Sequence, residues 1–222
     1  MYIARRALTF MQSLLKSYGP TKIKEVLWDK EFSGDKWNFI DNTLGDCVYP
    51  HLEKWAANGR ILDLGCGPGN TANEVAANSY QTYVGMDISE AALVKARKRT
   101  VESGRANKNS FAQGDFLSYV PPQRFDVILF RESMYHVPLG KVKAILDRFS
   151  NYLSDRGVFI VRMAVADDNG NSKYRPTAMV EIMETEFDVL EKAQYGEDAA
   201  TVIVFRPKRQ RPKDSRAFST KS

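Results

Sequence analysis

Cysteines and long apolar runs are scarce in this sequence. Its 222 residues include only two cysteines, Cys47 and Cys66. Two cysteines cannot build a disulfide framework, and Cys66 lies in a glycine-rich stretch that a disulfide would disturb, so we expect a reducing, cytoplasmic compartment. No apolar stretch is long enough to cross a bilayer, so we expect no membrane span.

The N-terminal stretch is the one segment that invites interpretation as a signal peptide, because Arg5 and Arg6 precede apolar residues. Gln12 and Ser13 interrupt that apolar stretch, and no small-residue cleavage site follows it. One face at helical spacing carries Ala7, Phe10, Met11, Leu14 and Leu15. We therefore expect an amphipathic helix packed on the body of the protein.

Positive charge is concentrated at the C-terminus. The net charge is +5, but seven of the basic residues follow Phe205, so residues 1–205 carry 25 basic and 26 acidic groups. Nucleic-acid-binding proteins usually spread basic groups over a face of the folded domain. We expect residues 207–222 to form a flexible basic tail and regard nucleic acid as an improbable partner.

Beyond the first 55 residues, short runs rich in β-forming residues alternate with helical stretches. The expected strands are Arg60–Leu64, Thr82–Asp87, Asn109–Gln113, Phe125–Phe130, Val158–Ala164, Phe187–Ala193 and Thr201–Phe205. The expected helices are Thr71–Ala77, Glu90–Ser103 and Lys141–Leu153, the last ending before the stop signal Asp155–Gly157. This alternation predicts an α/β fold with a mostly parallel sheet and helices on both faces.

The last two expected strands break the alternation. Only a short turn around Gly196 separates them, which leaves no room for a crossover helix. They must therefore form an antiparallel hairpin, so the sheet has seven strands and the last is antiparallel.

A glycine-rich turn follows the first expected strand, in Asp63-Leu64-Gly65-Cys66-Gly67-Pro68-Gly69. Glycines there let the backbone turn tightly against a ligand. A dinucleotide fingerprint requires Gly or Ala where Asn70 stands. A P-loop requires a lysine at the helix start, where Asn70-Thr71 has none. Both nucleotide interpretations are therefore disfavoured.

This turn resembles the first motif of class I, Rossmann-like S-adenosylmethionine-dependent methyltransferases of the small-molecule type. The resemblance implies that Asp63 faces the methionine portion of the cofactor and that Gly65, Cys66, Gly67 and Gly69 lie against it. A carboxylate also suits an ammonium-bearing ligand and would repel a pyrophosphate. The family's fold is a three-layer sandwich with strand order 3-2-1-4-5-7-6, which the terminal hairpin independently supports.

Acidic residues lie at the ends of the next two expected strands. Asp87 stands 20 residues after Gly67, where its carboxylate can accept both ribose hydroxyls of the cofactor. By the resemblance, Ile88 lies against the adenine. Gly114, Asp115 and Phe116 follow the third expected strand. The resemblance implies that the Asp115 carboxylate accepts a hydrogen bond from the adenine amine.

The residues after the fourth expected strand, Arg131–His136, should face the transferred methyl group and include Arg131 in the cofactor site. They lack the motif of enzymes that methylate base amines. Glu132 has no second glutamate at the spacing of protein arginine methyltransferases. Imidazoles titrate near neutral pH, so His136 is the candidate general base, with Tyr135 as its partner or rival.

Two further features complete the candidate site. Asp168-Asn169 resembles half of a metal site, but its first half is missing, so we interpret it as a turn and expect no metal. The aromatic N-terminal segment contains Trp28 and Trp37, which we expect to cover the cofactor as a lid or to anchor the segment to the sheet.

Together these features predict three parts: a helical lid over residues 1–55, a catalytic domain over residues 56–206 and the basic tail. The expected function is methyl transfer from S-adenosylmethionine to oxygen, nitrogen or carbon of a small-molecule acceptor, with S-adenosylhomocysteine as product, by a monomer or homodimer. Two alternatives stay open. One is an RNA or protein methyltransferase that uses the tail, and the other is a cofactor-binding protein without catalysis.

Overall fold

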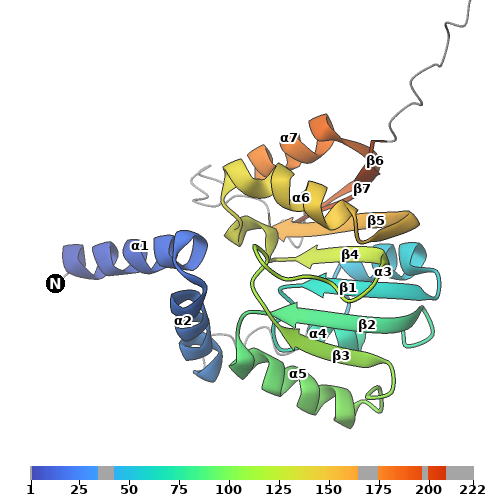
Figure 1. Cartoon of the computed structure of the whole chain (residues 1–222), viewed down its shortest axis with the longest axis horizontal. Coiled ribbons are helices and arrows are strands. Elements are labelled where there is room, and N and C mark those ends of the chain that lie inside the picture. Colours follow the sequence, from blue (N-terminus) through green and yellow to red (C-terminus); the bar gives the residue numbers. More distant parts are fainter. Residues whose placement is uncertain (1, 35–42, 165–174, 197–199, 209–222) are drawn as a thin grey trace, which may run out of the picture.

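A seven-stranded sheet organises the computed structural model, which describes residues 2–34, 43–164, 175–196 and 200–208, with side chains from residue 10 onward. Its strand order is β3-β2-β1-β4-β5-β7-β6, as expected from the sequence (Figure 1). The strands are β1 (Gly59–Leu64), β2 (Tyr80–Asp87), β3 (Asn109–Gln113), β4 (Phe125–Arg131), β5 (Leu153–Ala164), β6 (Phe187–Tyr195) and β7 (Ala200–Pro207).

Neighbouring strands from β3 to β5 pair in parallel, while β7 pairs antiparallel with both β5 and β6. The predicted terminal hairpin is therefore confirmed. Because β1 to β4 are parallel, their carboxyl ends lie along one edge, and the N-terminal helices lie beyond that edge (Figure 1). Ligands of open α/β sheets bind at this edge.

The described α-helices are α1 (Tyr2–Tyr18), α2 (Thr21–Ser33), α3 (Val48–Ala56), α4 (Asn70–Glu74), α5 (Glu90–Glu102), α6 (Val142–Ser150) and α7 (Pro176–Glu186). Helices α3 to α7 cover the two faces of the sheet, whereas α1 and α2 lie beyond its strand ends (Figure 1). Residues of α3 and α4 share one apolar layer with the sheet, and residues of α6 and α7 share the other. The predicted three-layer sandwich is confirmed.

Alternation along the central strands explains why both faces are apolar. Ile61 of β1 and Val127 of β4 are partners that face the α3 side. Their successors Leu62 and Ile128 are also partners and face the α6 side. Successive side chains of a strand point to opposite faces, so a strand buried on both sides reads as a continuous apolar run.

Two element predictions need correction. The stop signal Asp155–Gly157 lies inside β5, because α6 ends at Ser150 and β5 starts at Leu153 opposite Phe125. An irregularity in pairing between Phe125 and Val127 accommodates the extra residues of β5. Helix α7 was not predicted, although Pro176, Met179, Val180 and Met183 are buried along one side of it at helical spacing.

The N-terminal amphipathic helix exists as α1, but its predicted packing on the body is wrong. Phe10, Met11 and Leu14 are exposed, and α1 packs against α2 rather than along the sheet. Figure 1 shows α1 running away from the strand ends. Among the helices that the structure describes, none is long and apolar enough to cross a membrane.

Candidate active site

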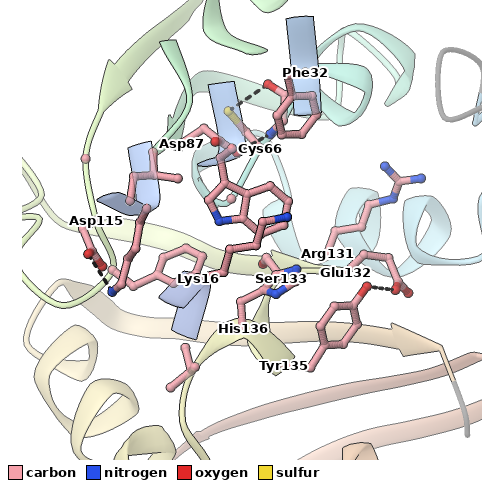
Figure 2. Close-up of a pocket in the computed structure, with 18 of the residues that line it drawn as sticks. Lys16, Phe32, Cys66, Asp87, Asp115, Arg131, Glu132, Ser133, Tyr135 and His136 are labelled. Atoms are coloured by element: carbon pink, nitrogen blue, oxygen red, sulfur yellow. Dashed lines mark hydrogen bonds and ion pairs between the residues drawn. The ribbon is translucent and has the colours of Figure 1, made fainter. Parts of the chain in front are cut away.

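A cavity of about 500 Å³ lies at the carboxyl ends of β1 to β4, under α2. Its floor is the glycine-rich turn and the strand ends, and its roof includes Trp28 and Phe32 of α2. Figure 2 shows side chains from both parts directed into the same space. The cavity is therefore enclosed by two segments that lie far apart in sequence.

The three glycines of the turn all have positive φ, 83° at Gly65, 52° at Gly67 and 78° at Gly69. A Cβ at Gly65 would lie 2.5 Å from Ser133 Cβ, and a Cβ at Gly69 would lie 2.8 Å from Ala96 Cβ. A Cβ at Gly67 would have only Phe32 nearby, at 3.8 Å. Gly65 and Gly67 line the cavity, whereas Gly69 serves the packing of α4 on α5.

Asp87 ends β2 at the cavity wall. Its Oδ2 accepts a hydrogen bond from the Gly67 backbone amide at 2.8 Å, and its Oδ1 accepts one from the Ser89 amide at 2.9 Å. Burial raises the pKa of this carboxyl to about 6. Its neighbour Ile88 also lines the cavity. The side chain is thus fixed before any ligand binds.

Asp63 lies beneath the turn and does not line the cavity. The Tyr83 hydroxyl donates to its Oδ2, while its buried Oδ1 has no hydrogen-bond partner among the described residues. Burial raises the pKa of this carboxyl to about 6. Cys66 does line the cavity, and burial raises the pKa of its thiol, which makes it a poor nucleophile.

Asp115 follows β3 and is paired with a residue that the sequence analysis did not identify. Lys24 Nζ of α2 lies 2.9 Å from Asp115 Oδ2, and both side chains are buried. Thr21 Oγ1 also donates to Oδ2, and the Leu117 amide donates to Oδ1. Despite burial, the Leu117 amide and Lys24 hold the pKa of Asp115 below its usual range. Gly114 and Phe116 line the cavity beside it.

Helix α2 closes the cavity through its aromatic and polar residues. The Trp28 ring lies 4.8 Å from the His136 ring in an edge-on arrangement, and Lys16 Nζ lies 4.0 Å from the centroid of the Trp28 ring. Asp29 Oδ1 accepts hydrogen bonds from Ser89 Oγ and the Ala91 amide at the start of α5. The predicted lid position of Trp28 is consistent with this arrangement. Trp37 lies outside the described residues, as does Asp168-Asn169.

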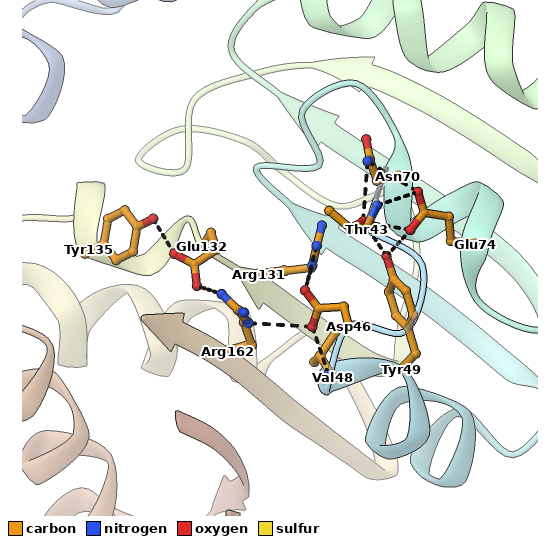
Figure 3. A network of polar contacts seen from close by, with 10 residues as sticks. All are labelled: Thr43, Asp46, Val48, Tyr49, Asn70, Glu74, Arg131, Glu132, Tyr135 and Arg162. Carbon is orange, nitrogen blue, oxygen red and sulfur yellow. Dashed lines mark hydrogen bonds and ion pairs between the residues drawn. The ribbon is translucent and has the colours of Figure 1, made fainter. Parts of the chain in front are cut away.

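Glu132, just after the end of β4, contacts Tyr135, one of the residues expected to face the acceptor. The Tyr135 hydroxyl donates to Glu132 Oε2 at 2.5 Å, and Arg162 of β5 pairs with Oε1 (Figure 3). Glu132 has a φ of 54°, which non-glycine residues rarely adopt. Tyr135 contacts His136 with ring centroids 4.9 Å apart. Both side chains line the cavity.

Asp46 connects Arg131 and Arg162 to the N-terminal part of the chain. Its Oδ2 accepts from Arg131 Nη2 at 2.6 Å, and its Oδ1 lies 3.6 Å from Arg162 Nε. Although burial alone would raise it, Arg131 holds the pKa of Asp46 below its usual range. Arg131 therefore lines the cavity with its charge already compensated.

The structure brings together most of the predicted site residues. Those that line the cavity are Trp28, Gly65, Cys66, Gly67, Asp87, Ile88, Gly114, Asp115, Phe116, Arg131, Tyr135 and His136. Asp63 and Gly69 do not line it. Sequence reasoning missed Lys24, Asp46 and Arg162, because each acts through a partner distant in sequence. Glu132 directly follows the end of β4, and this position in the sequence already indicated that it lies at the site.

The fold is an α/β domain with a cavity at the glycine-rich strand ends, the edge at which open α/β sheets bind their ligands. A family model described as a methyltransferase domain matches residues 56–203. The chain belongs to this family, so the class predicted from the sequence is confirmed.

Curated relatives match parts of the chain. The chain is 29% identical over 120 residues to sterol 24-C-methyltransferase erg6 of Aspergillus fumigatus, covering 52% of this chain and 31% of that protein. It is 37% identical over 82 residues to a ubiquinone biosynthesis O-methyltransferase of Thiobacillus denitrificans, covering 37% of this chain and 35% of that protein. The chain thus spans about a third of the length of these curated relatives.

Solved structures share the fold. The N-methyltransferase NodS from Bradyrhizobium japonicum, in complex with S-adenosyl-L-homocysteine, superposes with a TM-score of 0.65 at 18% identity, covering 83% of this chain and 98% of that chain. The glycopeptide N-methyltransferase MtfA, complexed with sinefungin, gives a TM-score of 0.61 at 14% identity, covering 73% of this chain and 86% of that chain. At these identities the likeness concerns the fold alone.

Proposed function

We propose that this protein transfers a methyl group from S-adenosylmethionine to an oxygen, nitrogen or carbon atom of a small-molecule acceptor. The observation that carries the proposal is the cavity in which the open backbone of Gly67 and the fixed carboxylate of Asp87 lie side by side. Relatives that methylate sterols and ubiquinone precursors, by their names, support an acceptor of this size class.

The chain's residues fit this donor. The Gly67 turn leaves space where a side chain would intrude, and Asp87 can accept from ribose hydroxyls. Ile88 and Phe116 would flank the adenine, with Asp115 at its edge. Asp63, with one buried oxygen that lacks a described partner, would favour the ammonium of the methionine portion through space. When bound, the donor supplies an electrophilic methyl group.

The acceptor would lie among Trp28, Arg131, Tyr135 and His136. Methyl transfer is an in-line displacement, so positioning is the main catalytic device and no covalent nucleophile is required. His136 would remove the acceptor's proton, with Tyr135 beside it. Glu132 acts as a positioning residue, because it fixes the Tyr135 hydroxyl.

The proposed organisation assigns residues 1–55 to a helical lid, 56–206 to the catalytic domain and 207–222 to a basic tail. Lys24, Trp28 and Asp29 support the lid, since each contacts the catalytic domain. Neither Cys47 nor Cys66 forms a disulfide, which supports a reducing, cytoplasmic compartment.

An acceptor screen read out by release of S-adenosylhomocysteine tests the proposal. The panel contains hydroxylated, amine-bearing and prenylated or sterol-like small molecules, with RNA and protein substrates as comparators. We expect turnover on a small molecule that survives deletion of residues 207–222 and is insensitive to salt. Turnover restricted to RNA or protein and lost with the tail would contradict the acceptor class. Donor binding with no turnover on the whole panel would contradict catalysis.

Once an acceptor is found, His136→Gln tests the proton acceptor. We expect a lower kcat and loss of the acid limb of the pH–rate profile. His51→Gln is the matched control, because His51 is buried beside Tyr195, away from the cavity. An unchanged profile in His136→Gln would exclude the imidazole as the base.

A further inference from the structure

Helix α1 carries an exposed apolar stripe. Phe10, Leu14 and Tyr18 follow one another at four-residue spacing, with Met11 beside them, and they are 66%, 43%, 66% and 57% exposed, respectively. Single exposed apolar side chains are ordinary on protein surfaces. Four on one side of one helix form a contiguous patch, which is typical of an interaction surface.

The other side of α1 is committed to the cavity. Lys16 and Ser17 line the cavity, and Lys16 forms an ion pair with Glu31 of α2. The Lys16 ammonium also lies over the Trp28 ring. The apolar stripe is therefore held next to the site by residues of the same helix, and it faces away from them.

The charge of α1 indicates what the stripe contacts. The helix contains the basic residues Arg5, Arg6 and Lys16 and no acidic residue. A second copy of the chain docked stripe to stripe would bring two cationic helices together, which is unfavourable. Lys16 is paired with Glu31 at the cavity, so the charge available for a partner comes from Arg5 and Arg6. An anionic lipid surface offers apolar chains for the stripe and phosphate charges that complement these arginines.

We propose that α1 docks on an anionic lipid surface, with Phe10, Met11, Leu14 and Tyr18 at the boundary between headgroups and acyl chains. The combination of an amphipathic helix, an all-basic charge and a large aromatic and aliphatic stripe defines an interfacial helix rather than a spanning one. This inference does not depend on the proposed methyl transfer.

Flotation of the 222-residue protein with lipid vesicles tests the proposal. We expect binding to vesicles of phosphatidylglycerol in phosphatidylcholine, weak binding to phosphatidylcholine alone, and loss of binding at high salt. The double variant Phe10→Ser/Leu14→Ser should bind anionic vesicles at least about tenfold more weakly, because it removes two large apolar groups. Val94→Ser/Val101→Ser on α5 is the matched control, since those valines are exposed elsewhere, and it should bind normally.

Two results would overturn the proposal. The first is an absence of binding to anionic vesicles, or equal binding by the wild-type protein and the Phe10→Ser/Leu14→Ser variant. The second is a concentration-dependent dimer, seen by sedimentation of the wild-type protein and lost in that variant, which would assign the stripe to a second copy. Circular dichroism and S-adenosylhomocysteine binding show whether the variant is folded. Failure of the wild-type protein to bind S-adenosylhomocysteine would contradict the proposed function without affecting the vesicle result.

Discussion

The two walls of the cavity are built in different ways. On the strand-end wall, Asp87 is held by backbone amides of its own turn and of the glycine-rich turn next to it. On the helical wall, α2 reaches the same cavity through side-chain contacts such as Lys24 with Asp115 and Asp29 with Ser89. The strand-end wall is therefore held by backbone hydrogen bonds of the sheet edge, whereas the helical wall is attached by a few polar side-chain contacts that single substitutions can remove.

The largest expected effect on stability comes from Gly65→Ala, which introduces a side chain into the strand-end wall. The new Cβ would lie 2.5 Å from Ser133 Cβ, and φ is 83°. We expect the free energy of unfolding to fall by about 4 kcal/mol, measured by urea denaturation. Gly67→Ala is the control, because its Cβ meets nothing nearer than Phe32 at 3.8 Å. It should lose about 1 kcal/mol of stability and mainly weaken donor binding. Equal losses of stability would contradict this distinction.

The next largest expected effect on stability comes from Lys24→Met, which removes an ion pair that attaches the helical wall. It leaves Asp115 buried without its cation, and breaking a buried pair in this way costs about 3 kcal/mol. We expect faster amide hydrogen exchange throughout α2, with unchanged exchange in β1 and β4. Lys22→Met is the matched control, since Lys22 is exposed on the same helix and pairs only locally with Glu25. Destabilisation of the sheet together with α2 would show that the two walls are not separable.

Asp87→Ala removes one carboxylate from the strand-end wall and leaves the rest of that wall unchanged. Loss of charge-assisted hydrogen bonds should weaken S-adenosylhomocysteine binding by about 2 kcal/mol, or roughly 30-fold, in calorimetry. Asp188→Ala on the edge strand β6 is the control and should bind normally. An unchanged affinity in the Asp87→Ala variant would remove Asp87 from the donor site.

The smallest expected effect is the pH dependence of donor binding. Because the pKa of Asp87 is raised to about 6, its protonation below that pH removes an acceptor. Affinity for S-adenosylhomocysteine should fall by up to about tenfold per pH unit below 6. Asp63 titrates in the same range, so Asp63→Asn is the control that isolates Asp87. The raised pKa values place the change between about pH 5 and 7. An affinity that stays constant over this range would contradict the assignment of Asp87 to the donor site.

Stability of the ligand-free protein should change in the opposite direction. The folded-state pKa values of Asp63 and Asp87 lie above the ordinary 3.8. Such groups stabilise the fold when protonated, so their contribution is complete below about pH 4 and is lost as the pH rises through about 6. Thermal unfolding across this range, with and without S-adenosylhomocysteine, separates the two trends.

The same contrast between walls explains what could be predicted from the sequence. Asp87 and Asp115 follow strands whose order is fixed by alternating elements, so their convergence at one edge was predictable. Lys24, Asp46 and Arg162 were not, because their partners lie in other elements and no local pattern marks them. The exposure of Phe10 was also not predictable, since helical spacing identifies an apolar face but not its partner.

The Lys24–Asp115 pair has a consequence for the order in which the protein folds. Its two residues are 91 positions apart, and Thr21 is 94 positions from the same carboxylate. During synthesis α1 and α2 leave the ribosome well before their docking partner at the end of β3 is made. The roof of the cavity can therefore be put in place only after β3 has been made, and closing a loop of this length carries an entropic cost that a local contact avoids. Until then, Trp28 and Phe32 of α2 lack the cavity that they cover in the folded protein and are accessible to chaperones.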